Sequence, residues 1–142
     1  MSPFRRGVRM PSDPSAVAAI AAVRKQWDVL FNAGRLAELA ELFYTEDAHA
    51  LPPDTPHIEG RDEIRKFFQA FYDSGKVEFQ LDVIRIEASG DYGYVTGNYT
   101  LSVTPHGGAT QRWRGETNEA FRKGPDGAWR CCADMWHHVA EI

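Results

Sequence analysis

Apolar side chains recur every three or four residues along the first half of the chain, which is the spacing of one buried helix face. The clearest run covers residues 15–32, where Asp13 or Ser15 can cap the start and Gly34 can end the helix. A shorter run, residues 35–43, predicts a second helix, and residues 60–75 predict a third. The apolar stripes are Val17, Ile20, Val23 or Arg24, Trp27, Leu30 and Phe31; then Leu36, Leu39, Leu42 and Phe43; then Ile64, Phe67, Phe68 and Phe71.

After Gly75 the apolar period changes from about 3.6 to about 2, which is typical of strands with one buried face. Short turns rich in Gly, Pro and Asp divide this half into four strands, which are therefore expected to be antiparallel neighbours. The strands are predicted at residues 77–88, 92–103, 109–123 and 128–139, with a short first strand at residues 49–51. These elements predict an α+β fold: three N-terminal helices packed on one face of a curved antiparallel sheet of four long strands plus a short first strand.

The last strand carries an unusual mixture of side chains. Because alternate residues of a strand share a face, one face is expected to hold Cys132, Asp134, Trp136 and His138. The other face is expected to hold Trp129, Cys131, Ala133 and Met135. A carboxylate beside an indole and an imidazole suits the wall of a pocket for a small, partly apolar organic molecule.

Asp134 and Glu119 are the candidate catalytic residues. The turn at residues 124–127 makes their strands adjacent, and Glu119 shares a face with Thr117 and Phe121. Two carboxyl groups in an apolar cavity are expected to have raised pKa values and can then serve as acid and base near neutral pH. The alternative is a structural role, in which Asp134 bonds to Trp27 or to a neighbouring side chain.

Composition excludes several classes of function. Hydrophobic residues make up 43% of the 142 residues, charged residues 25%, and the net charge is −4, so we expect no nucleic-acid partner. No apolar run is long enough for a membrane span. The five histidines show no metal-ligand spacing, and no phosphate-binding loop is present, so neither a metal nor a cofactor is expected.

The chain is expected to be one domain, residues 15–142, after a disordered leader at residues 1–14 that contains three arginines and shows no apolar periodicity. Cys131 and Cys132 are the only cysteines. Neighbours in a strand point to opposite faces and cannot easily form a disulfide, so reduced thiols and a cytoplasmic location are expected.

Four segments together resemble the NTF2-like superfamily, and more closely its SnoaL-like and DUF4440 branch of ketosteroid isomerase homologues. They are Trp27-Asp-Val-Leu-Phe-Asn-Ala-Gly-Arg35, Leu42-Phe-Tyr-Thr-Glu-Asp-Ala48, Ile58-Glu-Gly-Arg-Asp-Glu-Ile-Arg-Lys-Phe-Phe68 and Gly127-Ala-Trp-Arg-Cys-Cys-Ala-Asp-Met-Trp136. The resemblance spans roughly residues 17–138. It implies a conical fold whose sheet and three helices enclose a pocket, usually in a homodimer.

Ketosteroid isomerase activity itself is disfavoured. The resemblance places Trp27 where the isomerases have a tyrosine donor, Pro52 where they have the aspartate base, and Glu119 near the second oxyanion donor. Proline cannot accept a proton. The resemblance and the strand alternation predict that the pocket is lined by Trp27, Pro52, Tyr99, Cys132, Trp136 and His138, although the aromatic residues can also be ordinary core and His138 an exposed strand end.

Two hypotheses of function remain. The first is a cofactor-independent acid–base enzyme (isomerase, lyase, cyclase or hydrolase) acting on a small organic ligand. The second is a non-catalytic dimeric binding or assembly module with a vestigial cavity. In either case a homodimer is expected through the outer face of the sheet, with Trp113, Val95 or Val103 supplying apolar contacts.

Overall fold

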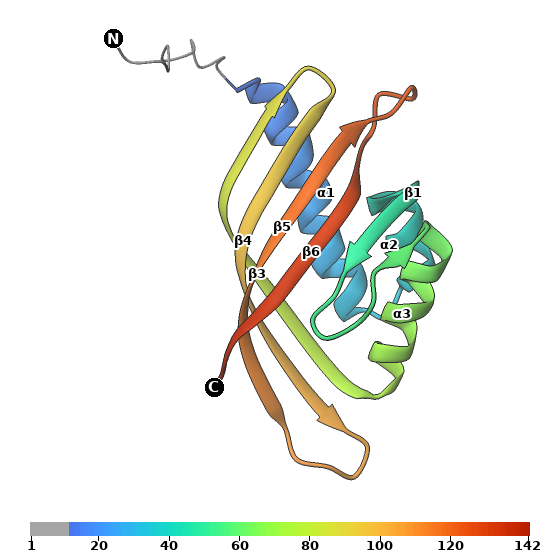
Figure 1. The fold of residues 1–142 in the computed structure, drawn as a ribbon, viewed down its shortest axis with the longest axis vertical. Coiled ribbons are helices and arrows are strands. Elements are labelled where there is room, and N and C mark those ends of the chain that lie inside the picture. The colour runs from blue at the N-terminus through green and yellow to red at the C-terminus, as the bar shows by residue number, and fades with distance from the viewer. Residues whose placement is uncertain (1–11) are drawn as a thin grey trace.

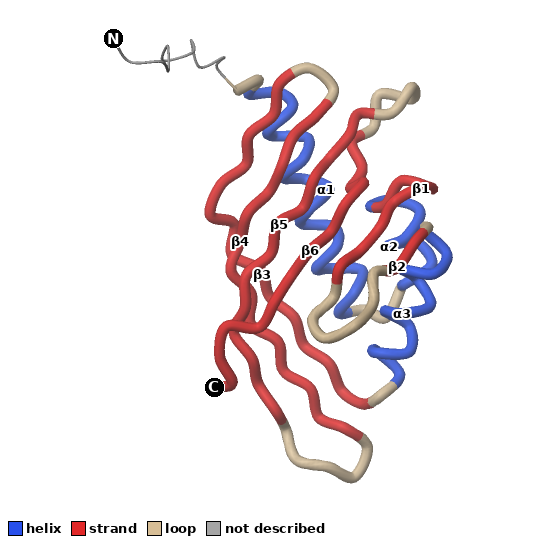
Figure 2. The backbone as a smooth tube through the Cα atoms, in the orientation of Figure 1, coloured by secondary structure: helices blue, strands red, loops and turns tan. Residues whose placement is uncertain are grey.

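The computed structural model describes residues 12–142 and shows three helices and six strands in that range (Figures 1 and 2). In chain order they are α1 (Pro14–Asn32), α2 (Leu36–Phe43), β1 (Tyr44–Leu51), β2 (Ile58–Glu59), α3 (Arg61–Asp73), β3 (Gly75–Ser89), β4 (Tyr92–Pro105), β5 (Gln111–Lys123) and β6 (Trp129–Glu141). Of the leader predicted at residues 1–14, residues 1–11 lie outside the described part of the chain.

The start of α1 is fixed to the end of β3. Asp13 caps the helix, its side chain accepting a hydrogen bond from the Ser15 N–H at 3.0 Å, and Pro14 occupies the first turn, where no N–H is needed. The Asp13 N–H donates to the Ala88 carbonyl at 2.9 Å, and the Ser12 hydroxyl accepts from the Ala88 N–H at 2.8 Å. Ser12 and Asp13, expected in the leader, therefore contact the domain.

The six strands form one sheet in the order β2-β1-β6-β5-β4-β3. β1 pairs with β6 in parallel, and all other neighbours are antiparallel. The predicted α+β fold is confirmed, with two differences. β1 begins at Tyr44, directly after α2 and with no intervening turn, rather than at His49; the two-residue strand β2 was not predicted.

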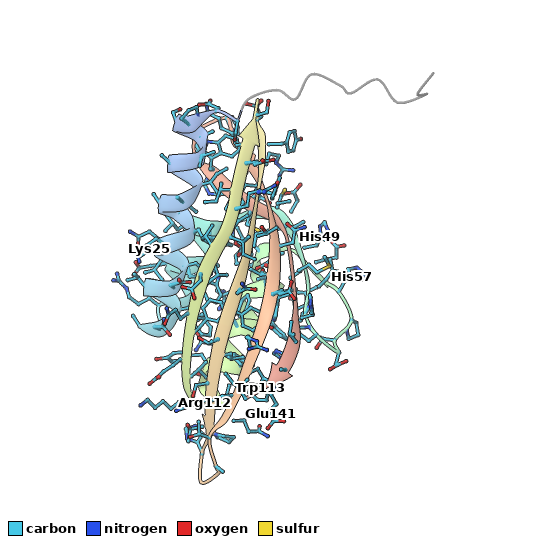
Figure 3. All side chains as sticks on the ribbon, turned by 90° about the vertical axis from the view of Figure 1, so that its left-hand side faces the viewer. Lys25, His49, His57, Arg112, Trp113 and Glu141 are labelled. Carbon is cyan, nitrogen blue, oxygen red and sulfur yellow. The ribbon has the colours of Figure 1, made fainter. Side chains whose placement is uncertain are left out.

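The helices pack on the inner face of the sheet. In Figure 1, α1 passes behind the long strands and α3 lies at the right, beside β1; Figure 3 shows α1 running along the inner face of the long curved strands. The predicted stripes form the interface: Ile20, Phe31 and Ile64 are at most 1% exposed. One position in the α1 stripe is charged, because Arg24 is only 3% exposed.

The residues proposed for the outer face of the sheet were wrongly assigned. Val95 and Val103 are buried in the core under the helices, and Trp113 is partly buried against the same core. Alternation along β4 and β5 instead turns Thr96, next to Val95 on β4, and Asn118, next to Glu119 on β5, to the outer face.

Candidate active site

A cavity of about 180 Å³ lies between the helices and the inner face of the sheet. Half of the residues that line it are aromatic: Trp27 and Phe31 from α1, Phe67, Phe68 and Phe71 from α3, and Phe79, Tyr99 and Trp136 from β3, β4 and β6. The rings fix one another by stacking and edge contacts; the Trp27 and Phe31 centroids, for example, lie 4.7 Å apart. This wall can hold a compact ring system.

Glu119 and Asp134 lie side by side in this wall. They are direct partners across β5 and β6, and their exposures are 3% and 4%. Two carboxyl groups at such burial are costly unless they are paired, protonated or used.

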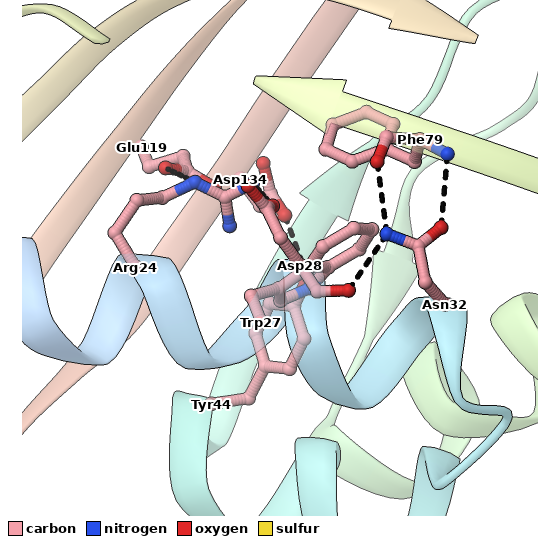
Figure 4. Close-up of polar contacts among 8 residues, drawn as sticks. All are labelled: Arg24, Trp27, Asp28, Asn32, Tyr44, Phe79, Glu119 and Asp134. Atoms are coloured by element: carbon pink, nitrogen blue, oxygen red, sulfur yellow. Dashed lines mark hydrogen bonds and ion pairs between the residues drawn. The ribbon is translucent and has the colours of Figure 1, made fainter. Parts of the chain in front are cut away.

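Asp134 is held by a hydrogen-bonded chain that begins on α1 (Figure 4). The Tyr44 hydroxyl donates to Asp134 Oδ2 at 2.6 Å, and the Trp27 indole N–H donates to the Tyr44 oxygen at 3.3 Å. Tyr44 is fully buried at the junction of α2 and β1, where the strand directly follows the helix. The short bond to Tyr44 leaves Asp134 Oδ1 for other chemistry.

Arg24 is a buried cation that faces two carboxyl groups. Its Nη2 donates to Asp28 at 2.8 Å, and its Nε lies 3.4 Å from Glu119 Oε1, too poorly aligned for a hydrogen bond. The guanidinium also lies 4.9 Å from the centre of the Trp27 ring. Counting partners within residues 12–142, Arg24 Nη1 and Nε and Glu119 Oε1 are buried without a hydrogen bond. Unsatisfied buried groups of this kind in a cavity wall are suited to a polar ligand.

The environment raises the pKa values of the two carboxyl groups by different amounts. Burial, opposed by Arg24 and reinforced by Asp134, raises the pKa of Glu119 to about 8. Burial also raises the pKa of Asp134, but the Tyr44 hydrogen bond and Arg24 lower it, and the result is about 6. At neutral pH the pair therefore holds one proton, on Glu119, beside an ionised Asp134.

Asn32 fixes the end of α1 to the cavity wall. Its amide donates to the Phe79 carbonyl at 2.9 Å and accepts from the Phe79 N–H at 3.0 Å, which closes a two-bond clamp onto β3 (Figure 4). The same amide group donates to the Asp28 carbonyl at 2.8 Å. The clamp sets the distance between the helix that carries Arg24 and the strand that carries Phe79.

At the other end of the cavity, Tyr99 and His138 form a second polar group. The Tyr99 hydroxyl and His138 Nδ1 lie 2.9 Å apart, and both residues line the cavity. His138 is also exposed, so it marks the mouth.

The structure gathers six of the eight predicted site residues around one cavity: Trp27, Tyr99, Glu119, Asp134, Trp136 and His138. Pro52 and Cys132 do not line it. Pro52 is buried, but its neighbour Pro53 faces the cavity.

Cys132 is displaced by a β-bulge. Cys131 pairs with Phe121 and Ala133 with Ala120, so Cys132 is an additional residue in β6. The bulge reverses the alternation, and the fully buried Cys131 therefore lies on the core side together with Asp134, contrary to the predicted face. The Cys132 thiol instead points to the Ala120 carbonyl at 3.5 Å, and both cysteines are free.

Three polar residues of the site were not predicted: Arg24, Asp28 and Tyr44. Arg24 left a signal, since it occupies a buried position of the first apolar stripe, and Asp28 follows it by one helical turn. No sequence pattern marks Tyr44 as a site residue, because residues 44–47 read as a break after the second helix. In residues 12–142, no three metal-ligating side chains gather in one place.

Several solved structures share this architecture. A ketosteroid isomerase-like protein from Erwinia carotovora atroseptica is 17% identical with a TM-score of 0.80, covering 90% of this chain and 99% of that one. A candidate dehydratase of the NTF2-like family from Streptomyces avermitilis is 19% identical (TM-score 0.77; 89% and 99% covered). A candidate scytalone dehydratase from Novosphingobium aromaticivorans is 14% identical (TM-score 0.80; 90% and 87% covered).

These similarities establish the class of fold: the protein has the NTF2-like fold, a sheet and three helices around a cavity. The family follows from the sequence. The SnoaL-like domain model matches residues 23–132, and the chain belongs to that family. No curated protein matches the chain at a significant level. Among the described helices, none has the length and apolar character that a membrane span requires.

Proposed function

We propose that the protein is a cofactor-independent lyase or isomerase that acts on a compact, partly apolar organic molecule by acid–base catalysis. One observation carries the proposal: Glu119 and Asp134 are opposed across two strands, both lie in the wall of an aromatic cavity, and their pKa values are raised to different extents. A pair of carboxyl groups whose environments separate their pKa values supplies an acid and a base at the same pH.

The pair suits removal of a proton from carbon next to a carbonyl group. Asp134, ionised and oriented by Tyr44, takes the proton from carbon through Oδ1. Glu119 gives its proton to oxygen: to the carbonyl oxygen in an isomerase, which forms an enol, or to a leaving hydroxyl in a dehydrating lyase, which releases water. In both cases one proton leaves the substrate and one enters it.

Arg24 supports the same chemistry. Its Nη1 is buried and lacks a hydrogen-bond partner among residues 12–142, while the guanidinium lies next to Glu119. A substrate oxygen that gains negative charge can accept a hydrogen bond from this group, and in a water-poor cavity such stabilisation is large.

The names of three solved neighbours support the proposal of this class of reaction. The solved neighbours include one protein named ketosteroid isomerase-like and two candidate dehydratases. Ketosteroid isomerase activity itself stays disfavoured, because Pro52 offers no base and the Trp27 N–H already donates to Tyr44.

The two free cysteines favour the cytoplasmic location expected from the sequence.

The proposal is tested with small cyclic ketones and β-hydroxy ketones that raise the melting temperature. Each is incubated with the protein in D2O, and deuterium at the carbon next to the carbonyl, or loss of water, is followed by NMR. We expect acceleration by the wild type and a loss of about 10²- to 10⁴-fold in Asp134→Asn and Glu119→Gln. Glu116→Gln, on the exposed face of β5, is the matched control and should retain the rate.

The outcome that contradicts the proposal is binding without chemistry. If ligands bind but neither exchange nor water loss exceeds the rate in buffer, the protein is a binding module. An unchanged rate in Asp134→Asn would exclude Asp134 as the base.

A further inference from the structure

Tyr99, Gly115 and His138 form one row across three strands. Tyr99 on β4 pairs with Gly115 on β5, and Gly115 pairs with His138 on β6. The strands at the two ends of the row are roughly 10 Å apart, since neighbouring strands are separated by about 4.8 Å. The Tyr99 hydroxyl nevertheless lies 2.9 Å from His138 Nδ1.

Gly115 makes this contact geometrically possible. A Cβ at this position would lie 2.1 Å from Tyr99 Cζ and 2.2 Å from its hydroxyl oxygen. The tyrosine ring therefore lies over the glycine backbone and reaches the second strand. Any larger residue at 115 would turn the ring away from His138.

The two side chains are held on their other sides as well. Tyr99 is 3% exposed and stacks on Phe79 at 5.7 Å, and the His138 ring stacks on Trp113 at 5.4 Å. Both residues line the cavity together with Trp136. The pair is thus a rigid polar group set in an aromatic wall, away from Glu119 and Asp134.

We propose that Tyr99 and His138 bind a second, uncharged oxygen function of the substrate, at the end opposite the reacting carbonyl. The substrate of the proposed acid–base reaction, on which this inference rests, is then a small ring carrying oxygen at both ends. Whichever of the two groups donates to the other, the pair keeps one donor for a ligand hydroxyl or carbonyl.

Dimensions and charge define the ligand further. Gly115 and His138 lie four residues along the strands from Glu119 and Asp134, on the order of 13 Å between Cα atoms, and the side chains occupy part of that length. An apolar cavity of about 150 Å³ binds benzene, so the 180 Å³ here suits one substituted ring or two small fused rings. Among the described residues that line the cavity, Arg24 is the one cation; it is already paired with Asp28 at 2.8 Å and faces the ionised Asp134 in the same wall, which disfavours an anionic ligand.

Burial of Tyr99 and partial desolvation of the exposed His138 keep the second polar group uncharged. Burial raises the pKa of Tyr99 to about 12 and desolvation lowers the pKa of His138, so a phenol faces a neutral imidazole at pH 7. A neutral pair discriminates for a hydroxyl over a carboxylate, because it has no charge to offer the latter.

The test uses three probes that differ only at the far end of one ring: acetophenone, 4-hydroxyacetophenone and 4-acetylbenzoate. Dissociation constants are measured by calorimetry at pH 7 for the wild type and for Tyr99→Phe, His138→Leu and His137→Leu. The wild type should bind the hydroxyl compound about fivefold more tightly than acetophenone, the effect of one hydrogen bond, and the carboxylate most weakly. Tyr99→Phe and His138→Leu should abolish the preference, while His137→Leu, on the exposed face, should keep it.

An equal preference in Tyr99→Phe and the wild type would overturn the inference, as would tightest binding of the carboxylate or no binding of either ketone at millimolar concentration. The measurement needs no turnover. If the hydroxyl preference depends on Tyr99 but no proton exchange occurs, the proposed reaction fails and this site remains. If exchange occurs without that preference, only this inference fails.

Discussion

Arg24, Glu119 and Asp134 are ionisable side chains inside the protein, each at most 4% exposed. Burial acts in the same direction on both carboxyl groups, and one cation is shared among them and Asp28. A glutamine at position 119 would keep the shape of the side chain and avoid the free-energy cost of burying an ionisable carboxyl group. The two buried carboxyl groups, which lower the stability of the fold, are therefore the groups that can serve as acid and base in the cavity.

The cost should be visible in the pH dependence of stability. The pKa of Glu119 is raised to about 8 from 4.5, so between these values the folded protein holds a proton that the unfolded chain has released. Stability therefore falls as pH rises through this window, by about 1.4 kcal/mol for each pH unit. Glu119→Gln does not titrate, so it should gain stability relative to the wild type from pH 5 to pH 8 in urea unfolding. A difference between Glu119→Gln and the wild type that stays constant over this pH range would show that Glu119 is ionised throughout.

The Tyr44 hydroxyl is expected to lower the pKa of Asp134, whereas burial raises it. Its hydrogen bond favours the ionised carboxyl and lowers the pKa of Asp134 against the effect of burial. Tyr44→Phe should therefore destabilise the protein more at pH 8 than at pH 5, by about 1–3 kcal/mol at the higher pH, where the carboxylate would lack its donor. The free energy of unfolding at the two pH values measures this. An equal loss at both would mean that only packing is affected.

Sequence reasoning located part of this site and missed the rest for identifiable reasons. Strand alternation and a short turn were enough to bring Glu119 and Asp134 together, because both are local rules. The apolar spacing of the first helix does not identify Arg24, because either Val23 or Arg24 fits the buried position of the stripe. Tyr44 was missed because its partner Asp134 is 90 residues away in sequence, and only the parallel pairing of β1 with β6 joins them.

At the scale of elements, helices and long strands followed from periodicity, whereas irregularities did not. The helices and the four long strands lie within a few residues of their predicted bounds. The bulge at Cys132 has no local signature, yet it decides which cysteine is buried and brings Cys131 to the same side as Asp134. Alternation predicts a face correctly only as far as the next bulge.

Gly115 is an element-scale position at which we expect little tolerance of change. A Cβ there would lie 2.4 Å from the His137 carbonyl as well as against the Tyr99 ring. Gly115→Ala should lower the free energy of unfolding by about 1–3 kcal/mol, the usual cost of overpacking. Gly108→Ala, in the β4–β5 turn with its nearest neighbour at 3.3 Å, is the control and should cost much less. Similar urea midpoints for the two variants would contradict the close packing of Tyr99 on Gly115.

For the whole molecule, we propose the homodimer expected from the sequence, through the face of the sheet that the described helices leave open (Figure 3). Ile84 and Met135, 60% and 48% exposed, lie beside the same shallow depression on that face and replace Val95 and Val103 as its apolar contacts. Ile84 is the additional residue of a bulge in β3, between Val83, which pairs with Gly97, and Arg85, which pairs with Thr96.

Light scattering at micromolar concentration should give twice 16.0 kDa for the wild type and a monomer for Ile84→Lys. Val29→Lys, at an equally exposed position on α1, is the matched control and should stay dimeric. A wild-type mass of 16.0 kDa, or dissociation by Val29→Lys alone, would place the dimer elsewhere or exclude it.

The central claim is that a protonated and an ionised carboxyl share one cavity at neutral pH. The most direct measurement is a 13C NMR titration of the side-chain carboxyl groups in the folded protein, with Glu119→Gln and Asp134→Asn used to assign the resonances. The account predicts that the pair titrates with apparent pKa values of about 8 and about 6. Titration of both groups near their ordinary values of 4.5 and 3.8 would leave two ionised carboxylates at pH 7 and contradict it.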